Sequence, residues 1–357
     1  MELTGKNVLV VGLARSGMAA IKVLHRLGAV ITLSESKKKE DIKELPELEK
    51  LGVTVVDQSM QVFEGNYALV VKNPGVPFRS PMMQRLAERN IPVITEIELA
   101  YNVAKPQHYV AITGTNGKTT TSTLVYELLA KTFPGKTHLC GNIGIPLCET
   151  VLENGLMEEG GHYIALEISN FQLVNIDRFR PEAAVILNLT PDHVDFMGSL
   201  DAYYKSKTEV YRNMSGSDLF LLNADDPVLA EYTAKYPVNC TVRTFSTDRS
   251  DTDSCVSGGY VCVNSEKVLP LDLIKIIGKH NLQNIIVAVS IAKAFGVTNE
   301  DICSVIADFR GVEHRIEFVR ELNGVKYYND SKGTNTDATV TALKAFDKGV
   351  ILLVGGF

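Results

Sequence analysis

The chain has 357 residues, of which 45% are hydrophobic and 22% charged, and its formal net charge at pH 7 is −6. This length suffices for two or three domains with hydrophobic cores of their own. The negative charge excludes a protein that holds nucleic acid on a general basic surface. The N-terminus has no signal-peptide pattern, no apolar run could span a bilayer, and the six cysteines lack metal-site spacing. These properties predict a cytoplasmic protein with reduced thiols and no membrane or nucleic-acid partner.

The N-terminal region has the pattern of a β-α-β unit, made of a strand, a glycine turn, a helix and a second strand at residues 8–11, 12–17, 18–27 and 30–33. Gly12 lies at the tight turn and Gly17 at the helix. Ala14 stands where a dinucleotide fingerprint has its middle glycine, and Glu35 lies where an acidic residue meets a ribose hydroxyl. The unit predicts an NAD(P) site, a site for another nucleotide, or a purely structural turn.

A second glycine-bearing loop, Asn73–Pro77, follows the apolar strand at residues 68–71. Ligands of open parallel sheets bind in loops at this end of the strands. An ordinary turn explains the same residues equally well.

The segment Tyr109–Thr121 has the pattern of a strand, a phosphate-binding loop and a helix. Gly114 and Gly117 let the backbone N–H groups point at phosphate oxygens, Lys118 supplies a positive charge, and the Thr119 hydroxyl can ligate Mg²⁺. The usual motif has a glycine where this chain has Ile112, so the loop is a variant form. The alternative is a glycine turn beside a surface lysine; we interpret the segment as an ATP site.

Two further apolar strands, at residues 163–168 and 183–189, end in polar side chains. Glu167 and Ser169 end the first, and Asp192, His193 and Asp195 follow the second. Because parallel strands share one carboxyl edge, these groups can converge with the phosphate loop on one Mg²⁺–nucleotide. The alternatives are a structural salt bridge at Glu167 and a structural role for His193.

The final region contains two strands at residues 316–321 and 325–328 around an Asn323-Gly324 turn, a helix at residues 337–346 and an apolar strand at residues 350–354. We expect this third domain to be incomplete. The predicted fold is α/β: a Rossmann-like N-terminal domain (1–105), a central P-loop ATPase-like parallel sheet with an antiparallel edge (106–310), and the start of a third Rossmann-like domain (311–357).

The ordered motifs resemble the Mur ligases, the ATP-dependent amide-forming enzymes of peptidoglycan precursor synthesis. The motifs cover nearly the whole chain and are Thr113–Thr120, Glu167–Leu173, Asn188–Asp195, His280-Asn281, His314-Arg315 and Asn329–Lys332. The two N-terminal loops look most like the branch that adds D-glutamate to UDP-N-acetylmuramoyl-L-alanine. The chain departs from the family pattern at Asn170, where serine is usual, and lacks most of the C-terminal domain.

The resemblance implies a role for each matching residue. The residues implied for the UDP substrate are Gly12, Ala14, Arg15, Ser16, Gly17, Glu35, Asn73, Pro74, Gly75 and Ser169. Those implied for ATP are Gly114, Thr115, Asn116, Gly117, Lys118, Thr119, Thr120, Asn281, Asn284, Arg315 and Asp330. For Asn281, capping of the following helix is the alternative.

The resemblance also implies two Mg²⁺ sites, ligated by Thr119, Glu167, His193 and a carbamylated Lys207. The residues implied at the reaction centre are Lys118, Asn142, His193, Lys207 and Lys332. The implied partners are small molecules, and we expect a monomer. The rival hypotheses are the family branch that adds L-alanine, a fragment that only binds nucleotides, and an NAD-dependent dehydrogenase.

Overall fold

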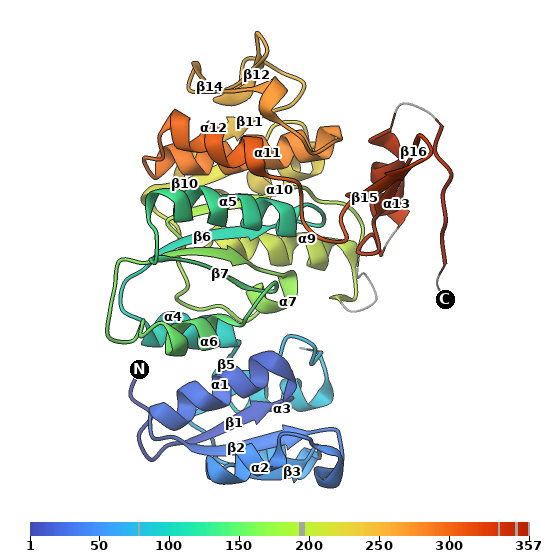
Figure 1. Cartoon of the computed structure of the whole chain (residues 1–357). Helices are drawn as coiled ribbons and strands as arrows, with labels where there is room; N and C mark the ends of the chain where they lie inside the picture. The colour runs from blue at the N-terminus through green and yellow to red at the C-terminus, as the bar shows by residue number, and fades with distance from the viewer. Residues whose placement is uncertain (78, 193–196, 335, 347–348, 356–357) are drawn as a thin grey trace. The chain divides into compact units, whose positions relative to one another are not determined.

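The computed structural model describes residues 1–77, 79–192, 197–334, 336–346 and 349–355, and it confirms the predicted mixed α/β fold (Figure 1). The chain divides into two compact units. The first unit comprises residues 1–111, 138–182 and 193–214, and the second comprises residues 112–137, 183–192 and 215–357.

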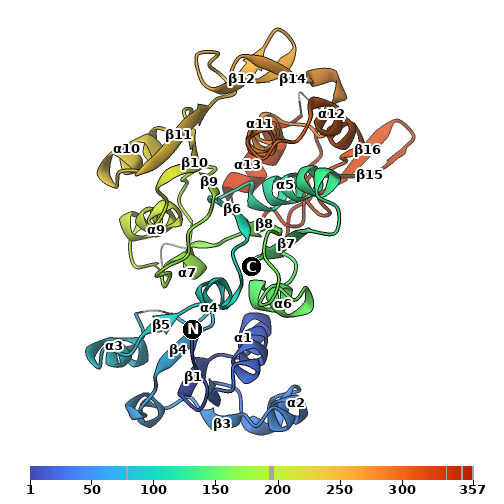
Figure 2. The same cartoon turned by 90° about the vertical axis from the view of Figure 1, so that its left-hand side faces the viewer.

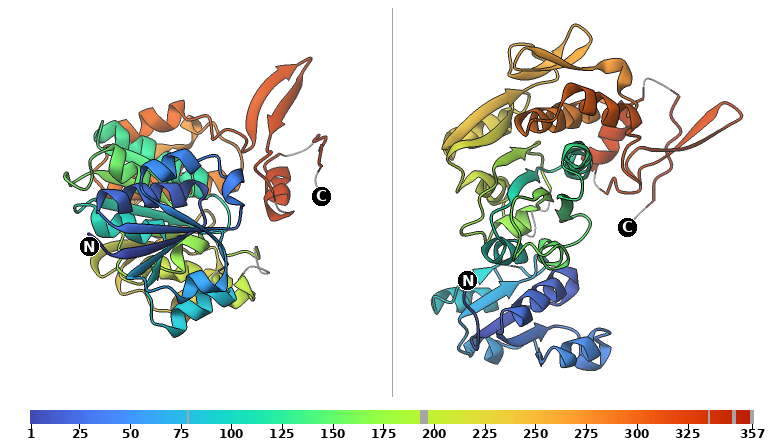
Figure 3. Two further views of the ribbon diagram at one scale, coloured as in Figure 1. Left: turned by 90° about the horizontal axis from the view of Figure 1, so that it is seen from below. Right: turned by 60° about the vertical axis from the view of Figure 1, so that its left-hand side comes forward.

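A five-stranded parallel sheet forms the N-terminal part of the first unit, in the order β3-β2-β1-β4-β5. Figure 3 shows its strands fanned by the usual twist. The strands are β1 (Asn7–Val11), β2 (Val30–Glu35), β3 (Thr54–Asp57), β4 (Leu69–Lys72) and β5 (Val93–Ile94). The helices are α1 (Ala14–Arg26), α2 (Leu45–Lys50), α3 (Pro81–Glu88) and α4 (Glu96–Val103). The predicted β-α-β unit is therefore confirmed, with β1 at the centre of the sheet.

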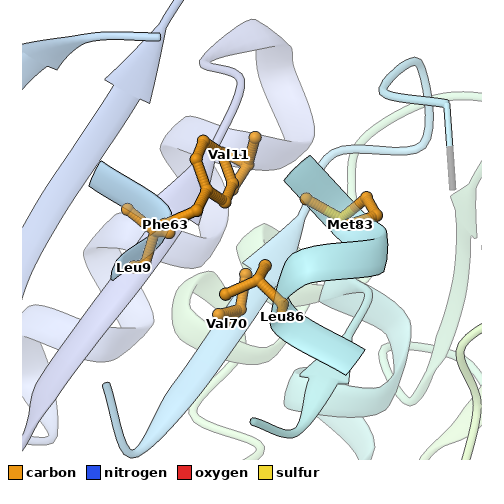
Figure 4. Close-up of a cluster of buried hydrophobic side chains, with 6 residues drawn as sticks. All are labelled: Leu9, Val11, Phe63, Val70, Met83 and Leu86. Carbon is orange, nitrogen blue, oxygen red and sulfur yellow. The ribbon is translucent and has the colours of Figure 1, made fainter. Parts of the chain in front are cut away.

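Alternate residues of β1 and β4 pack on one face of this sheet against α3 and the short helical turn at residues 60–64. The cluster, shown in Figure 4, consists of Leu9, Val11, Phe63, Val70, Met83 and Leu86. Each of these side chains is at most 5% exposed. Since successive strand residues face opposite sides, Val8 and Val10 are buried against the other face. Burial on both faces explains why these strands read as continuous apolar runs.

A nine-stranded sheet has the order β14-β13-β12-β11-β10-β9-β6-β8-β7. Strands β9 to β12 pair in parallel and β12 to β14 pair antiparallel, which confirms the predicted antiparallel edge. The strands are β6 (His108–Thr113), β7 (Thr137–Gly141), β8 (Tyr163–Glu167), β9 (Ala183–Ile186), β10 (Gly216–Asn223), β11 (Cys240–Phe245), β12 (Ser254–Ser257), β13 (Tyr260–Val263) and β14 (Glu266–Pro270).

Seven further helices of this region lie in the part of the chain that the structure describes. They are α5 (Lys118–Thr132), α6 (Leu147–Glu153), α7 (Asn170–Leu173), α9 (Leu200–Thr208), α10 (Pro227–Lys235), α11 (Lys279–Ala294) and α12 (Asn299–Asp308). Helices α5 and α11 pack side by side in the second unit (Figure 2). Within the described residues, no helix combines the length and apolarity needed to cross a membrane.

The last part of the second unit contains the antiparallel pair β15 (Glu317–Leu322) and β16 (Val325–Asn329) and helix α13 (Thr336–Lys344). The predicted hairpin is confirmed, and Asn323 and Gly324 both have positive φ (51° and 78°), as a two-residue turn requires. The strand predicted at residues 350–354 does not form, and Ile351 and Leu353 are 88% and 91% exposed. A buried strand needs neighbours to pair with, and in the described part of the chain β15 and β16 pair only with each other.

A buried carboxyl group connects two helices of the first unit. Glu96, at the start of α4, accepts a hydrogen bond at Oε2 from the backbone N–H of Cys148 in α6 (2.9 Å). Its Oε1 has no hydrogen-bond partner within the described residues. Burial raises the pKa of Glu96 to about 7, although the backbone hydrogen bonds oppose this shift. The folded state therefore binds the Glu96 proton more tightly than the unfolded chain does.

We expect Glu96→Gln to reduce the loss of stability between about pH 5 and about pH 8. A raised folded-state pKa favours folding below the ordinary value of 4.5, and this contribution, roughly 3 kcal/mol, disappears as the pH rises through about 7. Glutamine cannot ionise, so the Tm of the variant, measured by calorimetry, should fall less over this range. Glu153→Gln, at the exposed end of α6, is the matched control. An unchanged pH dependence in Glu96→Gln would contradict the assignment.

Candidate active site

The predicted phosphate loop lies in the second unit, between the end of β6 and the start of α5. Gly114 and Gly117 have φ angles of +144° and +86°, which disfavour any residue with a side chain. An added Cβ at Gly117 would lie 2.5 Å from Oδ1 of Asn284, and one at Gly114 would lie 3.0 Å from Cβ of Leu187. Both glycines are therefore required by the backbone and by close neighbours, and the strand-loop-helix prediction is confirmed.

The Lys118 ammonium lies across this loop. Its Nζ donates hydrogen bonds to the carbonyl oxygens of Gly114 (2.9 Å) and Thr115 (2.8 Å). Lys118 is also the first residue of the 15-residue helix α5, so its charge lies close to the positive end of the helix dipole. A helix N-terminus, a glycine loop and a lysine together suit a polyphosphate.

Asn188, just after β9, binds the phosphate loop through its side-chain amide. Its Oδ1 accepts the backbone N–H of Asn116 (2.8 Å) and its Nδ2 donates to the Asn116 carbonyl (3.0 Å). The Asn188 carbonyl accepts the backbone N–H of Thr115 (3.1 Å). Asn188 opens the Asn188–Asp195 motif, but no role was predicted for it; a polar residue directly after a buried strand was the available signal.

A cavity beside the loop brings together eight of the eleven residues predicted for ATP. They are Asn116, Gly117, Thr119, Thr120, Asn281, Asn284, Arg315 and Asp330. Asn188, His280 and Gln283 line the same cavity. Its walls come from the phosphate loop, the start of α11, the segment before β15 and helix α13, all within the second unit.

The structure corrects one alternative for Asn281. Helix α11 starts at Lys279 with Gly278 at the N-cap position and no side-chain cap. Asn281 instead donates from Nδ2 to the carbonyl of Ile277 (2.7 Å), and its Oδ1 accepts from Nδ2 of Asn284 (3.3 Å). The helix-cap alternative is therefore wrong, because the helix begins two residues before Asn281. The two linked asparagines form a polar wall of the cavity.

The far side of the cavity contains charged groups. Asp330 accepts the backbone N–H of Ile316 at Oδ1 (3.1 Å), which orients its carboxylate beside Arg315 and His280 in the cavity wall. Burial lowers the pKa of His280, and the nearby Asp330 opposes this shift. Lys332 is exposed and is not among the residues that line the cavity.

In the first unit, Glu167 lies at the end of β8, as predicted. Its Oε1 accepts a hydrogen bond from Nδ2 of Asn142 (2.7 Å), and the Asn142 N–H donates to the Glu167 carbonyl (2.8 Å). Its Oε2 is buried and has no hydrogen-bond partner among the described residues. A buried carboxylate oxygen without a donor is costly unless a cation meets it, so Glu167 fits a role as a metal ligand. Ser169 forms a capping box with Gln172 at the start of α7.

Lys207 is 1% exposed on α9, with its Nζ 4.6 Å from the centroid of the Tyr203 ring. His193 lies outside the described residues. Thr119 belongs to the second unit, whereas Glu167 and Lys207 belong to the first. Among the residues that the structure describes, no three histidine, cysteine, aspartate or glutamate side chains are grouped closely enough to hold a metal.

The two N-terminal glycine loops contact each other at the carboxyl edge of the first sheet. An added Cβ at Gly12 would lie 3.1 Å from Cβ of Asn73 and 3.2 Å from Cγ2 of Val76, and one at Gly17 would lie 2.2 Å from the Gly12 carbonyl oxygen. Helix α1 begins at Ala14, so the predicted residues Ala14, Arg15, Ser16 and Gly17 form its first turn. The close approach explains why glycine occupies both positions.

The Glu35 carboxylate organises this edge. Its Oε2 accepts the Leu13 N–H (2.7 Å), and its Oε1 accepts the N–H groups of Ser36 (2.8 Å) and Lys37 (3.2 Å). Burial acts to raise its pKa, but these hydrogen bonds lower it overall. Glu35 therefore fixes the backbone of two turns, the one after β1 at Leu13 and the one after β2 at Ser36 and Lys37.

Comparisons with known proteins show the family of this chain. The family model for the Mur ligase middle domain matches residues 112–292, and that for the MurD-like N-terminal domain of Mur ligases matches residues 6–95. The UDP-N-acetylmuramoylalanine–D-glutamate ligase of Geobacillus sp. (strain WCH70) is 40% identical over 354 residues, which is 98% of this chain and 77% of that protein. The chain belongs to the Mur ligase family. The ligase of the same name from Listeria monocytogenes serotype 4b is also 40% identical, covering 98% of this chain and 76% of its own length.

Solved Mur ligases share the fold. UDP-N-acetylmuramate–alanine ligase (MurC) from Thermotoga maritima superposes with a TM-score of 0.53 at 21% identity, covering 96% of this chain and 79% of that chain. A murein peptide ligase from Psychrobacter arcticus gives a TM-score of 0.57 at 19% identity, covering 95% and 75%. At this identity the superpositions show the common Mur ligase fold alone.

In this Mur ligase, we expect Asn188→Ala to weaken ATP binding by up to about 30-fold. The variant removes two hydrogen bonds to the Asn116 peptide, each of which contributes about 1 kcal/mol. Calorimetric titration with ATP measures the effect. Asn213→Ala is the matched control, because Asn213 also donates to two backbone carbonyls, those of Asp177 and Phe179, in the other unit. Equal ATP affinity in Asn188→Ala and the wild type would contradict this role.

Proposed function

We propose that this Mur ligase adds D-glutamate to UDP-N-acetylmuramoyl-L-alanine, with ATP converted to ADP and phosphate. The observation that carries the proposal is 40% identity to ligases of that name over 98% of the chain. The cavity beside the phosphate loop supports an ATP-dependent reaction, because it gathers the loop, two asparagines and Arg315. We also propose a cytoplasmic monomer with three domains (1–105, 106–310 and 311–357).

The nucleotide-binding groups of the second unit have distinct tasks in this proposal. Backbone N–H groups of the phosphate loop and the Lys118 ammonium bind the phosphates, and Asn281 and Asn284 face the adenine. Lys118 now donates to two loop carbonyls, so binding of ATP replaces protein acceptors with phosphate oxygens. Arg315, Asp330 and Lys332 approach the nucleotide from the third domain.

Four side chains are proposed as Mg²⁺ ligands: Thr119, Glu167, His193 and carbamylated Lys207. The unpaired Oε2 of Glu167 supports this set, because a hard divalent cation is the natural partner of such an oxygen. Bound Mg²⁺ supplies neutralisation of the charge on the reacting phosphate. Lys207 is buried, and an ammonium group cannot ligate a cation. It could act as a ligand only after its amine is converted to an anionic carbamate.

The reaction requires activation of a carboxylate. An oxygen of the substrate carboxylate attacks the γ-phosphorus, the bond to the β-phosphate oxygen breaks, and an acyl phosphate and ADP form. The amine of D-glutamate then attacks the acyl carbon, loses a proton, and expels inorganic phosphate. Lys118 stabilises the charge of the transferring group, and Asn142 orients the reacting carboxylate while its amide donates to Glu167.

The N-terminal domain is proposed to hold the UDP part of the substrate. The residues assigned to it are Gly12, Ala14, Arg15, Ser16, Gly17, Glu35, Asn73, Pro74, Gly75 and Ser169. The contact between the two glycine loops supports one shared site at the edge of the first sheet. The hydrogen bonds of Glu35 support a role in shaping that site.

We expect phosphate release from ATP only when UDP-N-acetylmuramoyl-L-alanine and D-glutamate are both present. A coupled phosphate assay on the full chain, with L-alanine, L-lysine and L-glutamate as competing amino acids, measures this dependence. UDP-N-acetylmuramate with L-alanine tests the neighbouring family activity. Release that depends on L-alanine, or nucleotide binding without any release, would refute the D-glutamate assignment.

We expect Lys207→Ala to abolish a carbamate signal as well as amide formation. Incubation with carbon-13 bicarbonate should give a carbamate resonance in the wild type that is absent from Lys207→Ala. Lys205→Ala, two residues away on the same helix, is the matched control and should keep the resonance. A carbamate resonance that persists in Lys207→Ala would show that another group carries it.

A further inference from the structure

A buried lysine lies beneath one of the two N-terminal glycine loops. Lys72 ends β4 and is 2% exposed. Its Nζ donates to the carbonyl oxygens of Asn73 (3.2 Å) and Val76 (2.9 Å). No ion pair found among the described residues includes Lys72. Desolvation lowers its pKa to about 8, so the group is mostly protonated at neutral pH.

The loop above Lys72 is held from several sides. The Asn73 N–H donates to the Val11 carbonyl (2.9 Å), and the Val76 N–H donates to the Asn73 carbonyl (3.0 Å). The Asn73 Oδ1 accepts the Gly75 N–H (3.1 Å). Two carbonyl groups thus turn inward to the ammonium, and the other side of the loop packs against Gly12. Lys72 therefore binds the loop at residues 73–76 directly, and this loop in turn packs against Gly12.

The other buried charge at this edge is already satisfied. Glu35 ends β2, and its two oxygens accept hydrogen bonds from Leu13, Ser36 and Lys37. Lys72 has only neutral carbonyl partners in the described structure. A buried cation that meets only carbonyl dipoles is incompletely compensated, and an anion bound above the loop would lower its energy.

We propose that Lys72 is a positioning residue for the diphosphate of the UDP substrate, holding the loop at residues 73–76 against Gly12 and supplying positive charge beneath it. This inference rests on the proposed function, because it takes the UDP moiety as the ligand of this edge. Lys72 acts through the loop and its field, since its side chain is buried away from solvent. The residue thereby favours nucleotides that carry a diphosphate over the uncharged nucleoside.

The charge of the ligand distinguishes this role from simple support of the loop. A loop that merely collapses loses contacts to uracil and ribose, so uridine and UDP would weaken together. A missing positive charge weakens UDP most, UMP less and uridine hardly at all, because the Coulomb interaction scales with ligand charge. The difference between these three probes therefore reports the electrostatic contribution directly.

The test is calorimetric titration of the wild type and Lys72→Met with uridine, UMP and UDP at constant low salt. Methionine has a similar length and no charge. We expect UDP affinity to fall about tenfold, UMP affinity to fall less, and uridine affinity, which loses only the support of the loop, to fall least. In the amide-forming assay, KM for the UDP substrate should rise while KM for ATP stays the same. Lys22→Met, on the partly exposed face of α1, is the matched control.

Two outcomes would overturn the inference: equal losses for uridine and UDP, or no loss for either. A wild-type chain that binds none of the three probes would overturn the UDP assignment itself, whereas UDP binding that is insensitive to Lys72→Met would overturn the role of Lys72 alone. If circular dichroism shows that Lys72→Met is unfolded, Lys72→Gln, which retains an amide donor for one loop carbonyl, gives the same comparison.

Discussion

The exchange of hydrogen bonds between the Asn188 amide and the Asn116 peptide is the contact on which the nucleotide cavity depends. The phosphate loop leaves β6 with backbone conformations that only glycine adopts easily, and a loop of this kind has no regular partner for its peptide groups. Asn188 supplies both a donor and an acceptor from the next segment of the sheet. The loop is consequently shaped before any ligand binds, which reduces the entropy cost of binding.

Buried charges at the ends of strands form a second common feature. Glu35, Glu167 and Lys72 each lie at the carboxyl end of a strand and are less than 9% exposed. Glu35 is satisfied by backbone N–H groups, whereas one oxygen of Glu167 has no described donor and Lys72 has only carbonyl partners. A buried charge without enough hydrogen bonds or opposite charge costs free energy. Such groups are therefore expected where a charged ligand supplies the missing interaction. The incompletely compensated charges of Glu167 and Lys72 thus lie where the proposed substrates would bind.

Glu96 shows that burial of a charge can also serve the scaffold. It links α4 to the start of α6 through the Cys148 N–H, and its raised pKa means that the link tolerates a neutral acid. The proposed role of Glu167 requires a carboxylate that can bind a cation, whereas Glu96 serves the scaffold as a neutral acid, although both residues follow apolar segments. Sequence pattern does not separate the two cases, because both are single acids beside hydrophobic residues.

The sequence by itself determined the parallel α/β fold, the antiparallel edge, the phosphate loop and most of the cavity. Strand periodicity, glycine placement and polar residues after buried strands are local signals that survive folding. Only the tertiary structure decided the start of α11 at Lys279, the two hydrogen bonds of the Asn188 side chain to Asn116, and the absence of a strand at residues 350–354. Two of these depend on a partner distant in the sequence: the Asn116 peptide for Asn188, and a neighbouring strand for the apolar run. The start of α11 is a local matter, because Asn281 donates to the Ile277 carbonyl only four residues before it. The identity of a residue does not say which group will be its hydrogen-bond partner in the folded chain. The partners of Lys72 and Glu96 could therefore be found only in the structure.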